Sequence, residues 1–265
     1  MDTSFTINNT DKVDNPNRKQ VISQRLISFS NEFTKTIIIL MVFLFLPLIS
    51  GSQESIPDLL RKYNSHEHDT IRINALLDIG MVYEKNNNPD SAKLYFKEAE
   101  KFSLKSLTNT KQKREEIEEL QLLSCRSQRY LALLYRNTGN QNESIETFKK
   151  VIQRYETLLK SIRKSRLDYT KSELSKTYNN LGTAYLSVGN YLASIESHNK
   201  SHELKLEIGD IKGAGISLVN IGNVHFYQGN LDEANKSYFE ALDVLNKTNE
   251  YKEISTTQTS IGNVY

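Results

Sequence analysis

Apolar residues recur at spacings of three and four from about Thr70 to the end of the chain. These spacings place them on one face of a helix, so the pattern predicts an all-α protein. Polar breaks interrupt the pattern, including residues 86–90 and the Gly-Asn pairs that begin at Gly189 and Gly229. A glycine at such a position can adopt the left-handed backbone that ends a helix. The pattern therefore predicts helices that are paired across tight turns.

One motif occurs three times near the end of the chain. An apolar residue precedes each of Gly182, Gly222 and Gly262, and a Tyr or His follows three residues later. These glycines lie 40 residues apart, and a fixed period of this size indicates a repeat array. A single helix pair cannot bury its apolar face, so neighbouring pairs must stack. We expect units at about residues 70–103, 112–160, 168–207 and 211–246, and a partial unit at 251–265.

The motif resembles the tetratricopeptide repeat. The pattern of that repeat is large–x–x–Leu-Gly–x–x–Tyr, then Gly-x-Tyr, then Ala–x3–Phe/Tyr–x–x–Ala. The chain matches this pattern best at residues 178–201 and 218–241, well at 76–99 and partly at 128–151. The resemblance covers residues 70–265 and implies a right-handed α-solenoid. The repeats are longer than the usual ~34 residues, as in the long-helix subtype of kinesin-light-chain-like arrays.

The N-terminal region has a different composition. Residues 1–36 are polar and Asn-rich, which predicts disorder. Residues 37–49 are an apolar run, shorter than the ~20 residues of a membrane-spanning helix. Residues 37–52 fit the hydrophobic core of a secretory signal with a cleavage-like site, or an uncleaved membrane anchor; the alternative is a buried core helix. We expect residues 53–69 to be a linker.

Charges around the apolar run favour an N-terminus inside the cell and repeats outside it. Arg25 and Lys35 are basic residues before the run, and Glu54 and Asp58 are acidic residues soon after it. We therefore expect an exported (periplasmic) or membrane-anchored protein. An exported array of this kind also resembles the sensory part of Bacteroidetes signalling proteins, in which it precedes a membrane helix and a histidine kinase or another output domain.

Composition and motifs exclude several functions. The net charge of +2 is too small to indicate a nucleic-acid partner. The single cysteine, Cys125, excludes a disulfide framework and is predicted to be a small buried residue. His198 and His202 have a spacing that can bind metal, but His198 occupies an aromatic core position and is predicted to pack. No phosphate-binding loop or nucleophile motif occurs. We expect no catalytic residues, no metal and no cofactor.

A concave groove lined by the first helices is the expected binding surface. Asn180, Asn220, Asn223 and Asn263 lie beside the glycines, and Phe226 with its neighbour Tyr227 adds an apolar pocket unless one of the two rings packs in the core. Amides donate and accept, which suits the backbone of an extended peptide. The resemblance implies that such asparagine ladders hold peptides. The alternative is that these asparagines are polar groove residues without a ligand.

We therefore expect a scaffold that binds a protein or peptide segment, as the sensing or interaction region of a signalling protein. The alternative is the input half of a truncated sensor histidine kinase or of another output enzyme. A third possibility is a cytosolic scaffold tethered to a membrane by its N-terminus. The last unit opens at Gly262 and stops at Tyr265, which favours a fragment of a longer protein.

Overall fold

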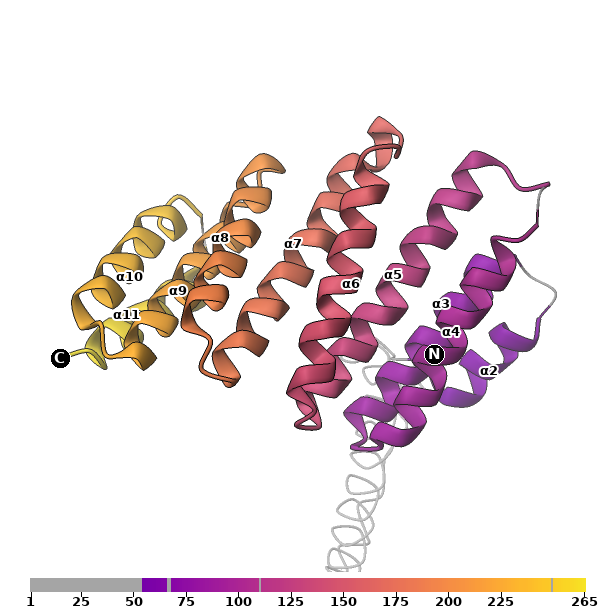
Figure 1. Cartoon of the computed structure of the whole chain (residues 1–265), viewed down its shortest axis with the longest axis horizontal. Helices are drawn as coiled ribbons and strands as arrows, with labels where there is room; N and C mark the ends of the chain where they lie inside the picture. The colour runs from indigo at the N-terminus through magenta and orange to yellow at the C-terminus, as the bar shows by residue number, and fades with distance from the viewer. Residues whose placement is uncertain (1–53, 66–67, 110, 249) are drawn as a thin grey trace, which may run out of the picture. The chain divides into compact units, whose positions relative to one another are not determined.

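The computed structural model describes residues 54–65, 68–109, 111–248 and 250–265. Their regular structure is entirely helical, and the helices follow one another in chain order (Figure 1). The bounds are α2 (Ile56–Asn64), α3 (Asp69–Lys85), α4 (Pro89–Ser106), α5 (Arg114–Asn137), α6 (Gln141–Leu159), α7 (Lys164–Ser187), α8 (Tyr191–Glu207), α9 (Ile211–Gln228), α10 (Leu231–Leu245) and α11 (Tyr251–Gly262). The all-α repeat architecture is thus confirmed.

Helices α3 to α10 form four pairs that begin and end within a few residues of the expected units. The expected leader at residues 1–36 and the signal or anchor at residues 37–52 lie outside the described residues. Among the helices that are described, none combines the length and the apolar character needed to cross a membrane.

Helix α2 corrects the expected linker over residues 53–69. Ser55 caps its N-terminus, because the Ser55 hydroxyl accepts from the Asp58 N–H at 3.4 Å, and Pro57 lies in its first turn. Leu59 is buried, and the Tyr63 ring packs edge-on against Phe102 of α4 at 6.3 Å. Helix α2 is only nine residues long and buries one apolar side chain, Leu59.

Each unit is held together by a close approach of its two helices. A Cβ on Gly80 would lie 2.4 Å from the ring of Phe96, and one on Gly222 would lie 2.5 Å from the ring of Tyr238. Both rings come 16 residues after their glycines, on the second helix of the pair. Ser194, which replaces the usual small Ala, donates to the Gly182 carbonyl at 2.7 Å. Serine is therefore accommodated by a backbone hydrogen bond.

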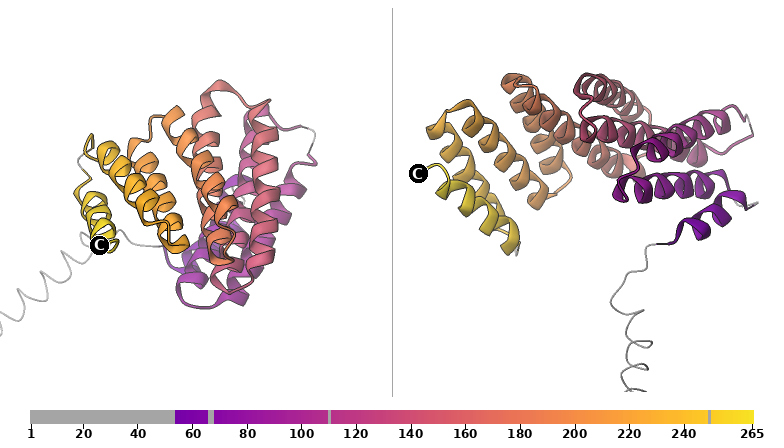
Figure 2. Two further views of the ribbon diagram at one scale, coloured as in Figure 1. Left: turned by 60° about the vertical axis from the view of Figure 1, so that its left-hand side comes forward. Right: turned by 90° about the horizontal axis from the view of Figure 1, so that it is seen from below.

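The first helices of the units form the inner layer of the array. Contacts between successive first helices join α3 to α5, α5 to α7, α7 to α9 and α9 to α11. Within the described part of the chain, successive second helices (α4, α6, α8 and α10) make no backbone approach of this kind. A layer whose members are closer together is the inside of a curve, so the first helices line the concave face. Figure 2 shows the same succession of helices from two further directions.

Two apolar clusters fill α3–α7, and neither includes a buried residue of a later helix. One cluster of buried apolar residues joins α3, α4 and α5, and a second joins α5, α6 and α7. The buried residues of α8, in contrast, are all polar: Ser194, Ser197, His198, Ser201 and Lys205. The joint between α8 and α9 consequently depends on hydrogen bonds more than on apolar burial.

Candidate ligand-binding groove

Two parallel rows of polar residues lie on the inner faces of α7 and α9. Asn180 and Thr183 belong to the row on α7, and Asn220 and Asn223 to the row on α9. A spacing of three residues keeps each pair on one helical face. All four side chains are half-buried, and α7 contacts α9 directly. The structure therefore brings three of the four predicted asparagines to one surface.

Asn179 links the two rows and was missed by the sequence analysis. Its Oδ1 accepts from Asn220 Nδ2 at 2.8 Å and lies 3.2 Å from His198 Nδ1. The only signal in the sequence was the Asn179-Asn180 doublet. Asn220 Oδ1 receives no hydrogen bond from the described residues, so this acceptor is available to a ligand.

The other two asparagines of the rows also keep one polar group each. Asn223 Oδ1 accepts from the Tyr238 hydroxyl at 2.8 Å, which leaves its Nδ2 as a donor. Asn180 Oδ1 accepts from Arg136 Nη1 at a long 3.4 Å, which likewise leaves an Nδ2 donor. Each asparagine is therefore held in place by the protein through one atom and can bind through the other.

A pocket of about 330 Å³ lies at the end of the two rows. It is lined by Thr183, Leu186, Ser187, Tyr191 and Tyr227. The Tyr227 side chain is 66% exposed, and Tyr191 donates from its hydroxyl to the Tyr227 carbonyl at 3.4 Å. We call this hollow the Tyr227 pocket.

Phe226 packs against Tyr227 but is not among the residues that line the Tyr227 pocket. It is half-buried, and its ring meets that of Tyr227 edge-to-face at 5.9 Å and 74°.

Asn263, the fourth predicted asparagine, is exposed at the C-cap of α11, where its backbone N–H donates to the Thr259 carbonyl. Among the described residues, no side-chain hydrogen bond joins Asn263 to the asparagines of α7 and α9.

Arg136 of α5 borders the α7 row, and Arg126 of the same helix reaches toward α3. Arg136 reaches Asn180 Oδ1 at 3.4 Å and Asn137 Oδ1 at 3.3 Å. Arg126 reaches Asn74 Oδ1 of α3 at 3.4 Å. Both are half-buried, and burial lowers the pKa of Arg136 while Glu84 acts in the opposite direction. These long contacts to neutral amides are weak compared with an arginine–carboxylate pair.

The histidines of α8 have structural roles. Burial lowers the pKa of His198 to about 4, so its ring is neutral at physiological pH. A Cβ on Gly182 would lie 2.7 Å from this ring, which places His198 in the aromatic position of its unit. His202 Nδ1 bonds the Ala214 carbonyl at 3.0 Å. In the part of the chain that the structure describes, no group of three His, Cys, Asp or Glu residues is arranged to hold a metal.

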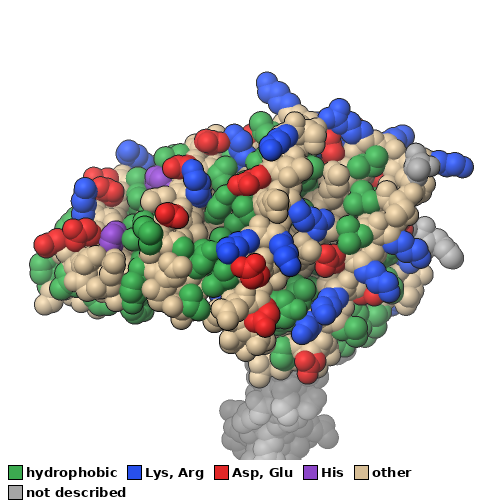
Figure 3. All heavy atoms as spheres, in the orientation of Figure 1, with side chains coloured by type: hydrophobic (Ala, Val, Ile, Leu, Met, Phe, Trp, Pro, Cys, Tyr) green, Lys and Arg blue, Asp and Glu red, His purple; other side chains and the backbone are tan. Residues whose placement is uncertain are grey.

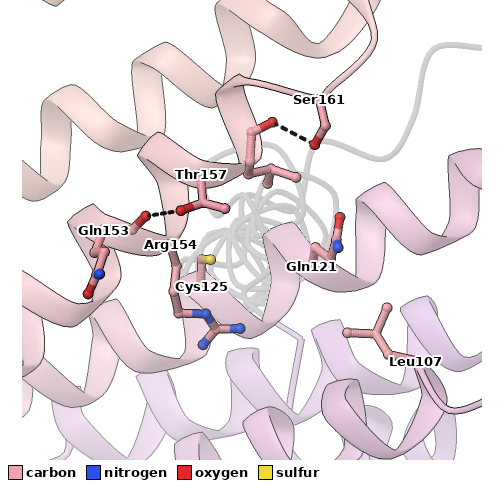
Figure 4. Close-up of a pocket in the computed structure, with 8 residues that line it drawn as sticks. Leu107, Gln121, Cys125, Gln153, Arg154, Thr157 and Ser161 are labelled. Atoms are coloured by element: carbon pink, nitrogen blue, oxygen red, sulfur yellow. Dashed lines mark hydrogen bonds between the residues drawn. The ribbon is translucent and has the colours of Figure 1, made fainter.

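A second hollow of about 360 Å³ lies among α4, α5 and α6 (Figure 4). Arg154 of α6 reaches into it, and its guanidinium bonds Gln128 Oε1 at 2.7 Å and Ser124 Oγ at 2.8 Å. Cys125 lies on its wall, and burial raises the pKa of the Cys125 thiol to about 11. The thiol is therefore protonated at neutral pH and is a poor nucleophile.

Charges of both signs are mixed on the face of the array shown in Figure 3. Lys and Arg side chains alternate there with Asp and Glu, and hydrophobic side chains lie between them. This mixture agrees with the net charge of +2. Such a face produces no strong field of one sign that would steer a charged partner toward it.

Comparisons with known proteins agree with this architecture. Three tetratricopeptide repeat models match residues 73–105, 127–157 and 173–247. No curated protein sequence matches the chain.

Solved structures with similar folds include BtubC (BKLC) from P. vanneervenii, with 16% identity, a TM-score of 0.63 and coverage of 80% of this chain and 79% of that one. They also include the nearly identical TPR-like repeats of a putative kinesin light chain from Podosopora anserina, with 16% identity, a TM-score of 0.57 and coverage of 76% and 88%. The apo form of RapI matches with 14% identity, a TM-score of 0.61 and coverage of 79% and 69%. These likenesses establish the fold, and together with the repeat matches they show that the chain belongs to the tetratricopeptide repeat proteins.

Proposed function

We propose that the chain binds an extended protein or peptide segment on the inner faces of α7 and α9. One observation carries the proposal: the asparagine rows, which keep open polar groups, run beside the Tyr227 pocket. Concave first-helix surfaces are the binding surfaces of solenoid proteins in general. Nothing in this arrangement requires a cofactor or a reaction.

Asn220 and Asn223 would bind the backbone of the segment. Asn220 Oδ1 would accept from a peptide N–H, and Asn223 Nδ2 would donate to a peptide carbonyl. Their other atoms are fixed by Asn179 and Tyr238, so little side-chain entropy is lost on binding. The Tyr227 pocket, at about 330 Å³, would hold one apolar side chain of the segment.

The test is selection from a displayed library of random nonapeptides on the immobilised full chain. We expect enriched sequences with an apolar residue at a fixed position. The double variant Asn220→Ala/Asn223→Ala should weaken binding of an enriched peptide by roughly 10- to 100-fold, because each lost hydrogen bond contributes about 1 kcal/mol.

Asn142→Ala is the matched control, because Asn142 is exposed on the outer helix α6. It should bind as the wild type does. Thermal melting of each variant checks that the fold is intact. Unchanged binding by a folded double variant would show that the groove between α7 and α9 is not the binding surface.

The cellular setting is a separate proposal. We propose that the array is the extracytoplasmic sensing or interaction region of a signalling protein, anchored or exported through residues 37–49. The apolar run and the charges on either side of it support this. Protease treatment of spheroplasts, in which the periplasm is open and the cytoplasm is closed, should degrade the repeats if they are outside the cytoplasm. Repeats that become sensitive only after the inner membrane is lysed would refute the proposal. The alternative, that the chain is the input half of a sensor histidine kinase or of another output enzyme, remains a prediction, and the gene sequence beyond Tyr265 tests it.

A further inference from the structure

A hollow of about 400 Å³ lies on the outer side of α7, the helix that separates α6 from α8 (Figure 1). We call it the outer pocket. Its α7 residues are on the opposite face of the helix from Asn180 and Thr183, so it is separate from the asparagine rows. Residues of α7 and α8 line it, including Tyr178, Leu181, Tyr185, Glu196, Asn199 and Lys200.

The corresponding groove between α4 and α6 contains cations of the chain itself. Tyr135 occupies the position of Tyr185, four residues before a left-handed turn glycine. The Lys93 ammonium lies 5.1 Å from the centre of the Tyr135 ring. Arg154 of α6 reaches across this groove to within 3.9 Å of the Glu100 carboxylate of α4. Cations therefore cover an aromatic ring and meet a carboxylate in this groove.

The outer pocket has no such cation over its rings. Within the described ranges, no Lys or Arg lies over the ring of Tyr178 or Tyr185. Lys149 of α6 and Lys200 of α8 are nearby, but each forms an ion pair at 3.0 Å with a glutamate three residues away in its own helix. The charges of both lysines are thus already compensated.

The pocket also keeps open carboxylate oxygens. Glu196 lines it and is exposed, and its carboxylate forms no hydrogen bond or ion pair with the described residues. Glu156 of α6 accepts from the Tyr178 hydroxyl at 2.6 Å through Oε1, which leaves its Oε2 as an acceptor. Carboxylates beside aromatic rings complement a cation, because both groups attract positive charge.

We propose that the outer pocket binds the guanidinium group of an arginine side chain from a partner protein, with Glu196 as its carboxylate and the Tyr185 ring as its stacking surface. A guanidinium is planar and weakly hydrated, so it can stack on a ring while it donates two hydrogen bonds to a carboxylate. The pocket opens between α6 and α8, where a side chain can enter from a bound segment. This inference does not depend on the proposed function of the inner face.

The experiment uses the full chain with Asn220→Ala/Asn223→Ala, which removes the proposed inner-face binding. Selection from displayed random nonapeptides should enrich arginine at a fixed position. An enriched peptide and its citrulline analogue, both acetylated and amidated, are then compared by fluorescence anisotropy. Citrulline keeps the shape of arginine without its charge and should bind roughly tenfold more weakly. Affinity for the arginine peptide should fall as the salt concentration rises.

Four variants make the result specific. Glu196→Gln should weaken binding of the arginine peptide by roughly 5- to 10-fold, and Tyr185→Leu by roughly 2- to 5-fold. Lys200→Gln removes a like charge from the pocket wall and should strengthen binding by about 2- to 5-fold, which a misfolded variant would not do. Glu240→Gln is the matched control, because Glu240 is exposed on the second helix α10. Far-UV circular dichroism shows whether each variant is folded.

Selected peptides without arginine would overturn the inference, and so would unchanged binding of the arginine peptide by folded Glu196→Gln. Agmatine, a free alkylguanidine, tests the source of the cation. If agmatine binds as tightly as the peptide, the pocket is a site for a small amine and the protein partner is refuted. None of these results bears on the inner-face proposal, which the chain with its native asparagines tests.

Discussion

Single glycines and the rings that face them set how closely the two helices of a unit approach. Gly182 faces His198 and Gly222 faces Tyr238, both at distances that leave no room for a methyl group. The glycine period and the packed role of His198 were predictable from sequence, because both follow from the repeat register. The link that Asn179 makes between α7 and α9 was not predictable from sequence, because its partner Asn220 belongs to another unit.

Gly222→Ala should destabilise the protein, because the new Cβ would lie 2.5 Å from the Tyr238 ring. Overpacking of this kind costs about 1–3 kcal/mol. Gly262→Ala is the matched control, because nothing lies within 4 Å of a Cβ there. Alanine is the better helix former, so that variant should be neutral or up to about 1 kcal/mol more stable. Urea unfolding measures both, and equal effects would refute the role of the close approach.

The buried His198 should make stability depend on pH. Its pKa is about 4 in the folded chain, against an ordinary value near 6.5 in the unfolded chain. Between these values the unfolded state binds the proton and the folded state does not. Stability therefore falls as the pH decreases from about 6.5 to 4, by on the order of 2–3 kcal/mol.

The buried residues Phe96 and Phe148 occupy the position of His198 in the α3–α4 and α5–α6 pairs. The substitution His198→Phe therefore gives the α7–α8 pair the same aromatic ring. The variant should lose that part of the pH dependence, and unfolding free energies measured at pH 4.5 and 7 test this. If the wild type and the variant lose the same stability on acidification, His198 is not the responsible group.

At the scale of helices, α8 is the exception among the second helices. Its fully buried residues are all polar and its Leu204 is only partly buried, whereas α6 buries Phe148, Tyr155 and other large side chains. It meets α9 through polar contacts, including Lys205 Nζ to the Gly213 carbonyl and to Ser217 Oγ, both at 3.0 Å. Burial lowers the pKa of Lys205, which reflects the unfavourable removal of its charge from water. The α8–α9 joint is therefore expected to be the least stable one.

Hydrogen exchange should show this difference directly. Amides in α8 and α9 should exchange faster than those in α5 and α6, because local opening follows regions with little apolar burial. Mass spectrometry of peptic fragments gives the comparison. Equal protection along α5–α9 would contradict the expected weak joint. Binding of a selected peptide across α7 and α9 should slow exchange at this joint.

At the scale of the whole array, each helix contacts only near neighbours in the chain. The free energy of unfolding of such an array is approximately a sum of contributions from the units and from the interfaces between them. The parts on either side of a weak interface can therefore unfold separately. We expect the part beyond α8 to unfold before α3–α7.

Urea unfolding followed by circular dichroism should accordingly be broader than one two-state transition. The apparent slope with denaturant should be lower than the chain length implies. His198→Phe, which adds apolar packing to α8, should make the transition sharper. A single steep transition with a slope appropriate to the full array would contradict this division of the molecule.

The sequence by itself determined the repeat register, the helix pairs and the packed roles of the glycines, His198 and Cys125. These features depend on periodicity and on contacts within one unit, which a sequence pattern records. Only the tertiary structure decided that α2 packs on the array and that Asn179 joins α7 to α9. Such features depend on side-chain contacts between units, and the periodicity of the sequence within each unit does not specify these contacts.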